Sequence, residues 1–166
     1  KKLGELSQGM KTKYLLTLAL SHGAKLFILD EPTSGLDPAA RDDLLEIFQE
    51  LVESGERSIL YSTHITSDLE KCADFITYIH NGRIIDSEAK DELLDGYRIV
   101  QGSSDLLQGT RERRLVSHRD HKYGFSGLVR TRDVSEFPEC EITPPTLEEI
   151  MIYYARRREH HEEPAL

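Results

Sequence analysis

The feature that most constrains this chain is a short apolar run, Leu26 to Leu29, followed directly by two carboxylates, Asp30 and Glu31. A run of this length and composition is typical of a buried strand in a parallel sheet. Open α/β sheets bind ligands at the carboxyl ends of their strands, which is where these two acids lie. Side chains alternate along a strand, so Asp30 and Glu31 point in different directions and can have different roles. One can hold a magnesium ion while the other orients or deprotonates an attacking water.

A second short strand is predicted over Ser58 to Tyr61, and it leads into a polar segment that contains His64. If the two strands are parallel, their carboxyl ends lie at the same edge of the sheet. The imidazole of His64 would then lie on the side of the sheet that carries Asp30 and Glu31. The pattern of strand, helix and strand predicts an α/β fold.

Two helices are predicted around these strands. The first begins near Ser7 and ends at Gly23, and its apolar positions have helical spacing: Met10, Tyr14, Leu15, Leu18 and Ala19. The second begins with Asp37 as its N-cap and Pro38 as its first residue, and its apolar face contains Leu44, Leu45, Phe48, Leu51 and Val52. A helix start favours an anion, so Ser7 is either a phosphate contact or an ordinary N-cap.

The C-terminal half has several local signals. Ser67 and Glu70 fit a capping box, and Asn81-Gly82 between two apolar runs predicts a β-hairpin. From Tyr97 we expect a small α+β unit with strands at 97–101, 115–118 and 126–131 and a helix at 104–111. A final amphipathic helix is predicted from the capping box Thr146 and Glu149, with Leu147, Ile150, Met151 and Tyr154 on its apolar face. We therefore assign residues 1–96 to a main domain and residues 97–166 to an accessory region.

Composition narrows the function classes. The net charge of −9 argues against a surface that follows nucleic-acid phosphates, and no apolar run is long enough to span a bilayer. Cys72 and Cys140 have no C-x-x-C spacing. His118 and His121 lack a further ligand cluster, so a solvated loop is expected there instead of a metal site.

Because the chain begins at Lys1 and its first motif follows at Leu6, we expect it to be a fragment.

Four motifs together resemble the nucleotide-binding subunits of ABC transporters. They are Leu6-Ser7-Gln8-Gly9-Met10, Leu26 to Glu31, Ser34-Gly35-Leu36-Asp37, and Ser62-Thr63-His64, in the order and spacing of that family. The segments 64–70 and 145–151 further resemble the ATP-binding subunits of bacterial two-component exporters of multidrug, antibiotic-peptide and lantibiotic type. The resemblance implies a P-loop NTPase-like parallel sheet with flanking helices, truncated before the Walker A part.

The resemblance also implies roles for single residues. Asp30 would hold Mg²⁺ and Glu31 would be the catalytic carboxylate, with His64 as the switch histidine that contacts the γ-phosphate. Ser7, Gln8 and Gly9 would belong to the signature motif that binds ATP across a dimer, and Asp37 would lie at the dimer seam. The cofactors implied are ATP and Mg²⁺, and the reaction is ATP hydrolysis.

The family pattern implies partners as well. Two subunits would meet head to tail, each completing the site of the other, and an integral membrane permease would be attached to them. The subunit would be cytoplasmic and peripheral on the inner face of the cell membrane, with no nucleic-acid partner. The transported substrate does not follow from this sequence.

Two departures from the family pattern affect these expectations. Gln8 and Met10 replace the third and fifth residues of the usual Leu-Ser-Gly-Gly-Gln signature. The chain also has no G-x-x-x-x-G-K-[ST] phosphate loop, so alone it is expected to bind ATP weakly or not at all and to be inactive. The alternatives are a soluble ABC-type ATPase that acts on ribosomes or DNA and a degenerate cassette that only binds; Glu31 and His64 argue against the latter.

Overall fold

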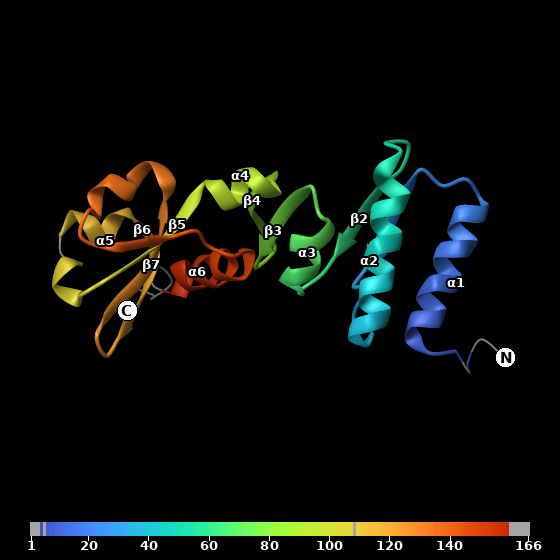
Figure 1. The fold of residues 1–166 in the computed structure, drawn as a ribbon, viewed down its shortest axis with the longest axis horizontal. Helices are drawn as coiled ribbons and strands as arrows, with labels where there is room; N and C mark the ends of the chain where they lie inside the picture. Colours follow the sequence, from blue (N-terminus) through green and yellow to red (C-terminus); the bar gives the residue numbers. More distant parts are fainter. Residues whose placement is uncertain (1–3, 5, 108, 160–166) are drawn as a thin grey trace. The chain divides into compact units, whose positions relative to one another are not determined.

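The computed structural model of the protein divides into two units between Cys72 and Ala73 (Figure 1). The structure describes Gly4 and residues 6–107 and 109–159. Within these residues, no helix is both long enough and apolar enough to cross a membrane. The first unit is α/β and the second is α+β, in agreement with the fold class expected from the sequence.

The first unit alternates helices and strands, in the order α1 (Gln8–Ser21), β1 (Leu26–Asp30), α2 (Pro38–Glu53), β2 (Ser58–Ser62) and α3 (Thr66–Cys72). Strands β1 and β2 pair in parallel, with Leu26 opposite Ser58 and Asp30 opposite Ser62. Both predicted strands are therefore confirmed, and their carboxyl ends meet at one edge. The third helix begins at Thr66, so Ser67 lies inside it and is not the N-cap expected from the sequence.

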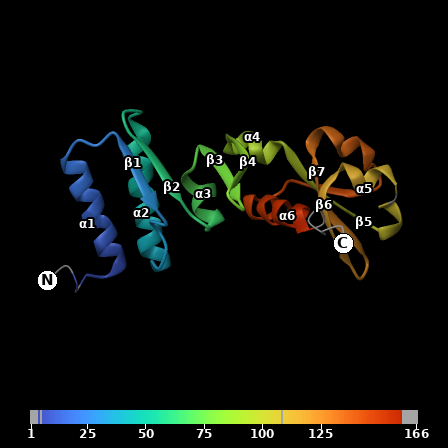
Figure 2. The ribbon, with the colours of Figure 1, turned by 180° about the vertical axis from the view of Figure 1, so that it is seen from behind.

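One face of the β1–β2 pair packs against α2. The buried core of this unit consists of Leu16, Phe27, Leu44, Leu45 and Phe48, which confirms the predicted apolar face of α2. Figure 2, which views the molecule from behind, shows β1 and β2 in front of α2. On the opposite face of the strands, Leu26, Ile28 and Leu60 are 57%, 71% and 62% exposed.

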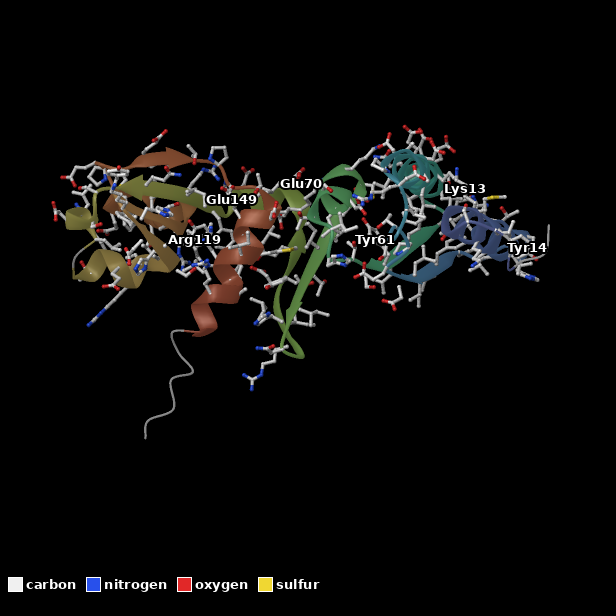
Figure 3. The ribbon with its side chains drawn as sticks, turned by 90° about the horizontal axis from the view of Figure 1, so that it is seen from below. Lys13, Tyr14, Tyr61, Glu70, Arg119 and Glu149 are labelled. Carbon is white, nitrogen blue, oxygen red and sulfur yellow. The ribbon has the colours of Figure 1, made fainter. Side chains whose placement is uncertain are left out.

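The face that helix α1 presents to the core shares only Ala19 with the predicted face. Leu16 is buried and Ala19 packs against the core, whereas Met10, Tyr14, Leu15 and Leu18 are all exposed. Lys13 forms an ion pair of 2.8 Å with Asp43 of α2, and Figure 3 shows Lys13 on the side of α1 that faces α2. Residues 14–20 are apolar on nearly every side, so periodicity alone does not select the face that packs.

The helix ends follow local sequence signals. Ser7 and Asp37 cap α1 and α2, with Oγ of Ser7 accepting from Met10 N (3.3 Å) and Oδ1 of Asp37 accepting from Ala40 N (3.0 Å). Gly23 and Gly55 follow the two helices with φ of 66° and 70°, as expected for glycines that end helices. These caps fix the starts of α1 and α2.

The second unit begins with the predicted hairpin, β3 (Phe75–His80) and β4 (Arg83–Ala89). Asn81 and Gly82 have φ of 47° and 71°, the left-handed pair that a two-residue hairpin turn needs. The hairpin is followed by α4 (Lys90–Asp95).

Four antiparallel strands in the order β6-β7-β5-β8 make up the main sheet of this unit. The strands are β5 (Tyr97–Gly102), β6 (Leu115–His121), β7 (Gly124–Arg130) and β8 (Glu141–Thr143), and the helical segments are η2 (Ser104–Leu106), α5 (Thr110–Arg114), η3 (Thr131–Glu136) and α6 (Leu147–Glu159). The helix expected over 104–111 is wrong, because Gly109, at φ 67°, separates two short helical segments.

The loop expected around His118 and His121 is also wrong, because β6 continues to His121 through its pairing with β7. Among the described residues, no group of three or more His, Cys, Asp or Glu side chains is placed to hold a metal ion.

Helix α6 is anchored at its start and along one face. Its predicted capping box is confirmed: Thr146 N donates to Glu149 Oε2 (2.8 Å), and Glu149 N donates to Thr146 Oγ1 (3.2 Å). Tyr153, which the sequence pattern missed, is buried; its hydroxyl lies 2.8 Å from Ser126 Oγ, and the guanidinium carbon of Arg119 lies 5.6 Å from the centre of its ring. The buried face of the helix is Leu147, Ile150, Tyr153 and Tyr154.

A polar cluster joins the hairpin to the sheet. The hydroxyls of Tyr97 and Tyr154 contact each other, and both donate to Asp86 Oδ2, at 3.4 Å and 3.1 Å. Burial and the contact with Tyr97 raise the pKa of Tyr154 well above its usual range, so its hydroxyl stays protonated. These contacts place the hairpin in the same compact unit as the sheet. The domain boundary after residue 96 stays a prediction.

Gly124 provides a test of the packing at the β6–β7 hairpin. A Cβ there would lie 2.0 Å from the backbone oxygen of Gly102, at a φ of 152°. We expect Gly124→Ala to lower the free energy of unfolding by about 3 kcal/mol, because β5 must move to accommodate the methyl group. At Gly82 the φ is 71° and a Cβ would meet open space, so Gly82→Ala should lower the free energy of unfolding by about 1 kcal/mol. Equal losses in urea denaturation would contradict this packing.

Candidate functional site

The carboxyl ends of β1 and β2 are joined through Ser62. Its hydroxyl donates to Asp30 Oδ1 (2.5 Å) and accepts from Glu31 N (3.1 Å), while its carbonyl oxygen also accepts from Glu31 N (3.1 Å). The parallel register places Ser62 directly opposite Asp30. The sequence analysis named Ser62 only as part of the motif Ser62-Thr63-His64 and gave it no role, although a polar residue opposite Asp30 in the neighbouring strand was the available signal.

Glu31 leaves the strand in an unusual backbone conformation. Its φ is 44°, which is uncommon for a residue other than glycine, and Ser34 N donates to its carbonyl oxygen (3.1 Å) to close the turn. One carboxylate oxygen, Oε1, lies 2.9 Å from His64 Nδ1. The other, Oε2, is buried and has no hydrogen-bond partner within the part of the chain that is described. The Glu31 carboxylate therefore has one oxygen paired with His64 and one buried oxygen without a partner among the described residues.

His64 completes this first group. Its ring nitrogen Nδ1 pairs with Glu31, yet its side chain is 73% exposed. The imidazole is thus oriented by a carboxylate and remains accessible to a molecule at the surface. The three residues that the sequence placed at one edge, Asp30, Glu31 and His64, are brought together by direct contacts to one another or to Ser62.

A second group lies at the starts of α1 and α2. A Cβ at Gly9 would lie 3.5 Å from Leu36 Cδ2 and 3.6 Å from Ala40 Cβ, so the two helix starts are close. Ser7 and Asp37 are the exposed N-caps of these helices. Gln8 is the first residue of α1, and its side chain lies outside the described part of the structure. Ser7 serves as an N-cap here; its contact with a phosphate remains a prediction.

Tyr61 lies on β2, directly before Ser62 (Figure 3). Burial is the main cause that raises its pKa well above the usual range, and its hydroxyl is 3.2 Å from Cys72 Sγ of α3. Tyr61 therefore stays neutral and connects β2 to α3.

The sequence of this chain is similar to those of known proteins. A family model described as "AAA domain, putative AbiEii toxin, Type IV TA system" matches residues 2–67. A putative ABC transporter ATP-binding protein of Mycoplasma pneumoniae is 35% identical over 124 residues, which are 72% of this chain and 37% of that protein. The lantibiotic transport ATP-binding protein SrtF of Streptococcus pyogenes is 43% identical over 81 residues, 49% of this chain and 35% of that protein. The chain carries part of an ABC ATP-binding domain.

A solved structure supports the fold of this partial ABC domain. It is titled "An inward-facing conformation of a putative metal-chelate type ABC transporter", with a TM-score of 0.53 and 23% identity over 78% of this chain and 49% of that one. The chain spans little more than a third of the two curated relatives, 37% and 35%. The ABC resemblance drawn from the four motifs is thereby confirmed, whereas the roles of single residues stay predictions.

Ser62 can be tested for its part in this ABC site. Ser62→Ala removes the hydroxyl that contacts both Asp30 and Glu31 N, so we expect a loss of about 1 kcal/mol in the free energy of unfolding. The matched control is Ser58→Ala, at the other end of β2 and also exposed. It should change the free energy of unfolding by less than about 0.5 kcal/mol. The measurement is urea denaturation, and equal effects at both serines would contradict the assigned contacts.

Proposed function

We propose that the complete protein is the ATP-binding and ATP-hydrolysing subunit of an ABC exporter. The observation that carries this proposal is the group formed by Asp30, Glu31 and His64 at the carboxyl ends of two parallel strands. The relatives named for lantibiotic transport and, at 36% identity, for bacitracin transport in Bacillus licheniformis support the exporter class.

Each residue of the group has a role in phosphoryl transfer to water. Glu31 would orient or deprotonate the attacking water, because its side chain is 36% exposed at the end of the sheet. His64, oriented by Glu31, would donate to the γ-phosphate. The hydrogen bond between them would hold the carboxylate and the imidazole side by side next to the γ-phosphate.

Magnesium fits the donors of this site. The ion prefers oxygen ligands and usually takes one or two carboxylates together with substrate phosphates, so a single acid such as Asp30 is sufficient. Ser62 already binds Oδ1 of Asp30 and holds the carboxylate in place. When bound, the ion would neutralise charge on the β- and γ-phosphate oxygens.

The second group would act across a dimer. Ser7, Gln8 and Gly9 lie at the start of the 14-residue helix α1, where backbone N–H groups favour a phosphate. In a head-to-tail homodimer they would reach the ATP of the partner subunit, with Asp37 at the seam. ATP would stabilise that dimer and hydrolysis would release it, so that an attached permease changes conformation. The subunit would be peripheral on the cytoplasmic face of the membrane.

We further propose that this chain alone is inactive. It lacks the G-x-x-x-x-G-K-[ST] loop whose lysine and backbone N–H groups hold the β-phosphate. Without that loop, the site would have the groups for hydrolysis and no cradle for the nucleotide.

The role of Glu31 can be measured as phosphate release by the complete protein. Glu31→Gln should lower kcat at least about 100-fold, because the amide cannot take a proton from water, and it should trap the ATP-bound dimer. Glu53→Gln, which changes an exposed acid at the end of α2, is the matched control and should leave kcat unchanged. The present chain alone should show no turnover. Unchanged phosphate release in Glu31→Gln would remove Glu31 from the mechanism.

The transporter assignment can be tested by isolating the complete Glu31→Gln protein from native membranes with ATP and identifying what copurifies by mass spectrometry. We expect a multi-spanning membrane protein, because the trapped dimer would remain attached to its permease. Recovery of ribosomes or DNA without a membrane subunit would contradict this assignment and favour the soluble ABC-type ATPase.

A further inference from the structure

A buried carboxylate lies outside the group at the carboxyl ends of the strands. The side chain of Asp68 is 2% exposed, and its Oδ1 is 4.0 Å from Arg41 Nη1. Asp68 Oδ2 and Arg41 Nε are both buried, and neither has a hydrogen-bond partner among the described residues. Asp68 is thus a nearly inaccessible acid that faces the guanidinium of Arg41.

A buried charge pair of this kind resists separation of the two helices that carry it. A carboxylate removed from water is costly unless a cation and hydrogen bonds compensate it. At 4.0 Å the two side chains attract each other without a direct hydrogen bond, and one buried polar atom on each of them has no hydrogen-bond partner among the described residues. Any movement that separates α2 from α3 would leave the charge of Asp68 uncompensated. The pair therefore opposes relative movement of the segments that carry it.

Those segments are the ones that carry proposed site residues. Asp68 lies on α3, directly after the loop of His64, and its backbone N donates to Ile65 O (3.2 Å) in that loop. Arg41 lies near the start of α2, and its backbone N donates to Asp37 O (3.0 Å). The two side chains thus connect the segment after His64 with the helix start at Asp37.

We propose that Arg41 and Asp68 are positioning residues that hold the His64 loop against the start of α2. The pair keeps His64 within reach of Glu31 and makes the position of His64 depend on that of Asp37. A displacement of the helix start capped by Asp37 then also displaces the imidazole of His64. This inference rests on the proposed ATPase function, because its consequence is an effect on turnover.

The test is a double-mutant cycle in the complete protein, with ATP hydrolysis as the readout. Asp68→Asn and Arg41→Gln should each lower kcat about tenfold and change KM for ATP less than about twofold, since neither residue touches nucleotide. The double variant should be no slower than the slower single variant, because the two side chains act as one unit. Circular dichroism and thermal unfolding establish the folded fraction, and kcat is expressed per folded molecule.

A matched control exists on the same two helices. Lys71 of α3 contacts Asp42 of α2 at the surface, with the Asp42 side chain 60% exposed. Asp42→Asn should leave kcat within about twofold of the unsubstituted protein, because an exposed pair contributes little to the position of α3.

The outcomes separate the inference from the function on which it rests. Multiplicative losses in the double variant, or a kcat per folded molecule unchanged in Asp68→Asn, would overturn the positioning role while leaving the ATPase intact. Losses in Asp42→Asn equal to those in Asp68→Asn would also overturn it. An unsubstituted complete protein that does not hydrolyse ATP would instead overturn the proposed function, and this inference with it.

Discussion

The parallel pairing of β1 and β2 is the constraint on which the site depends. Its register sets Asp30 opposite Ser62, and the hydroxyl and carbonyl of Ser62 then bind both the side chain of Asp30 and the backbone of Glu31. A slip of one residue would turn every side chain of one strand to the other face of the sheet. Phe27 would leave the core, so the apolar packing on α2 enforces the same register that the polar contacts need.

Much of the fold was predictable because its signals are local. Apolar runs marked β1 and β2, Asn81-Gly82 marked the hairpin, and Thr146 with Glu149 marked the start of α6. Each of these depends on residues close in sequence and on well-defined backbone requirements. The gathering of Asp30, Glu31 and His64 also followed from sequence, since parallel strands end at one edge of a sheet.

The remaining features depend on tertiary contacts that no local pattern contains. Contact with α2 decides which face of α1 is packed, and it buries Leu16 while Leu15 stays exposed. Tyr153 is buried, and its hydroxyl is paired with Ser126 of β7, a strand far from it in the sequence. Arg41 and Asp68 come together only when α2 and α3 pack, so neither was distinguished in the sequence.

The face of β1 and β2 turned away from α2 has a practical consequence. Leu26, Ile28 and Leu60 form an apolar surface on two strands that, among the described residues, pair with no other strand. Parallel sheets normally have both faces covered, and an exposed apolar strand surface promotes association between chains. In recombinant expression we therefore expect this chain by itself to enter inclusion bodies or remain bound to chaperones, and to need concentrations far below those used for crystallisation.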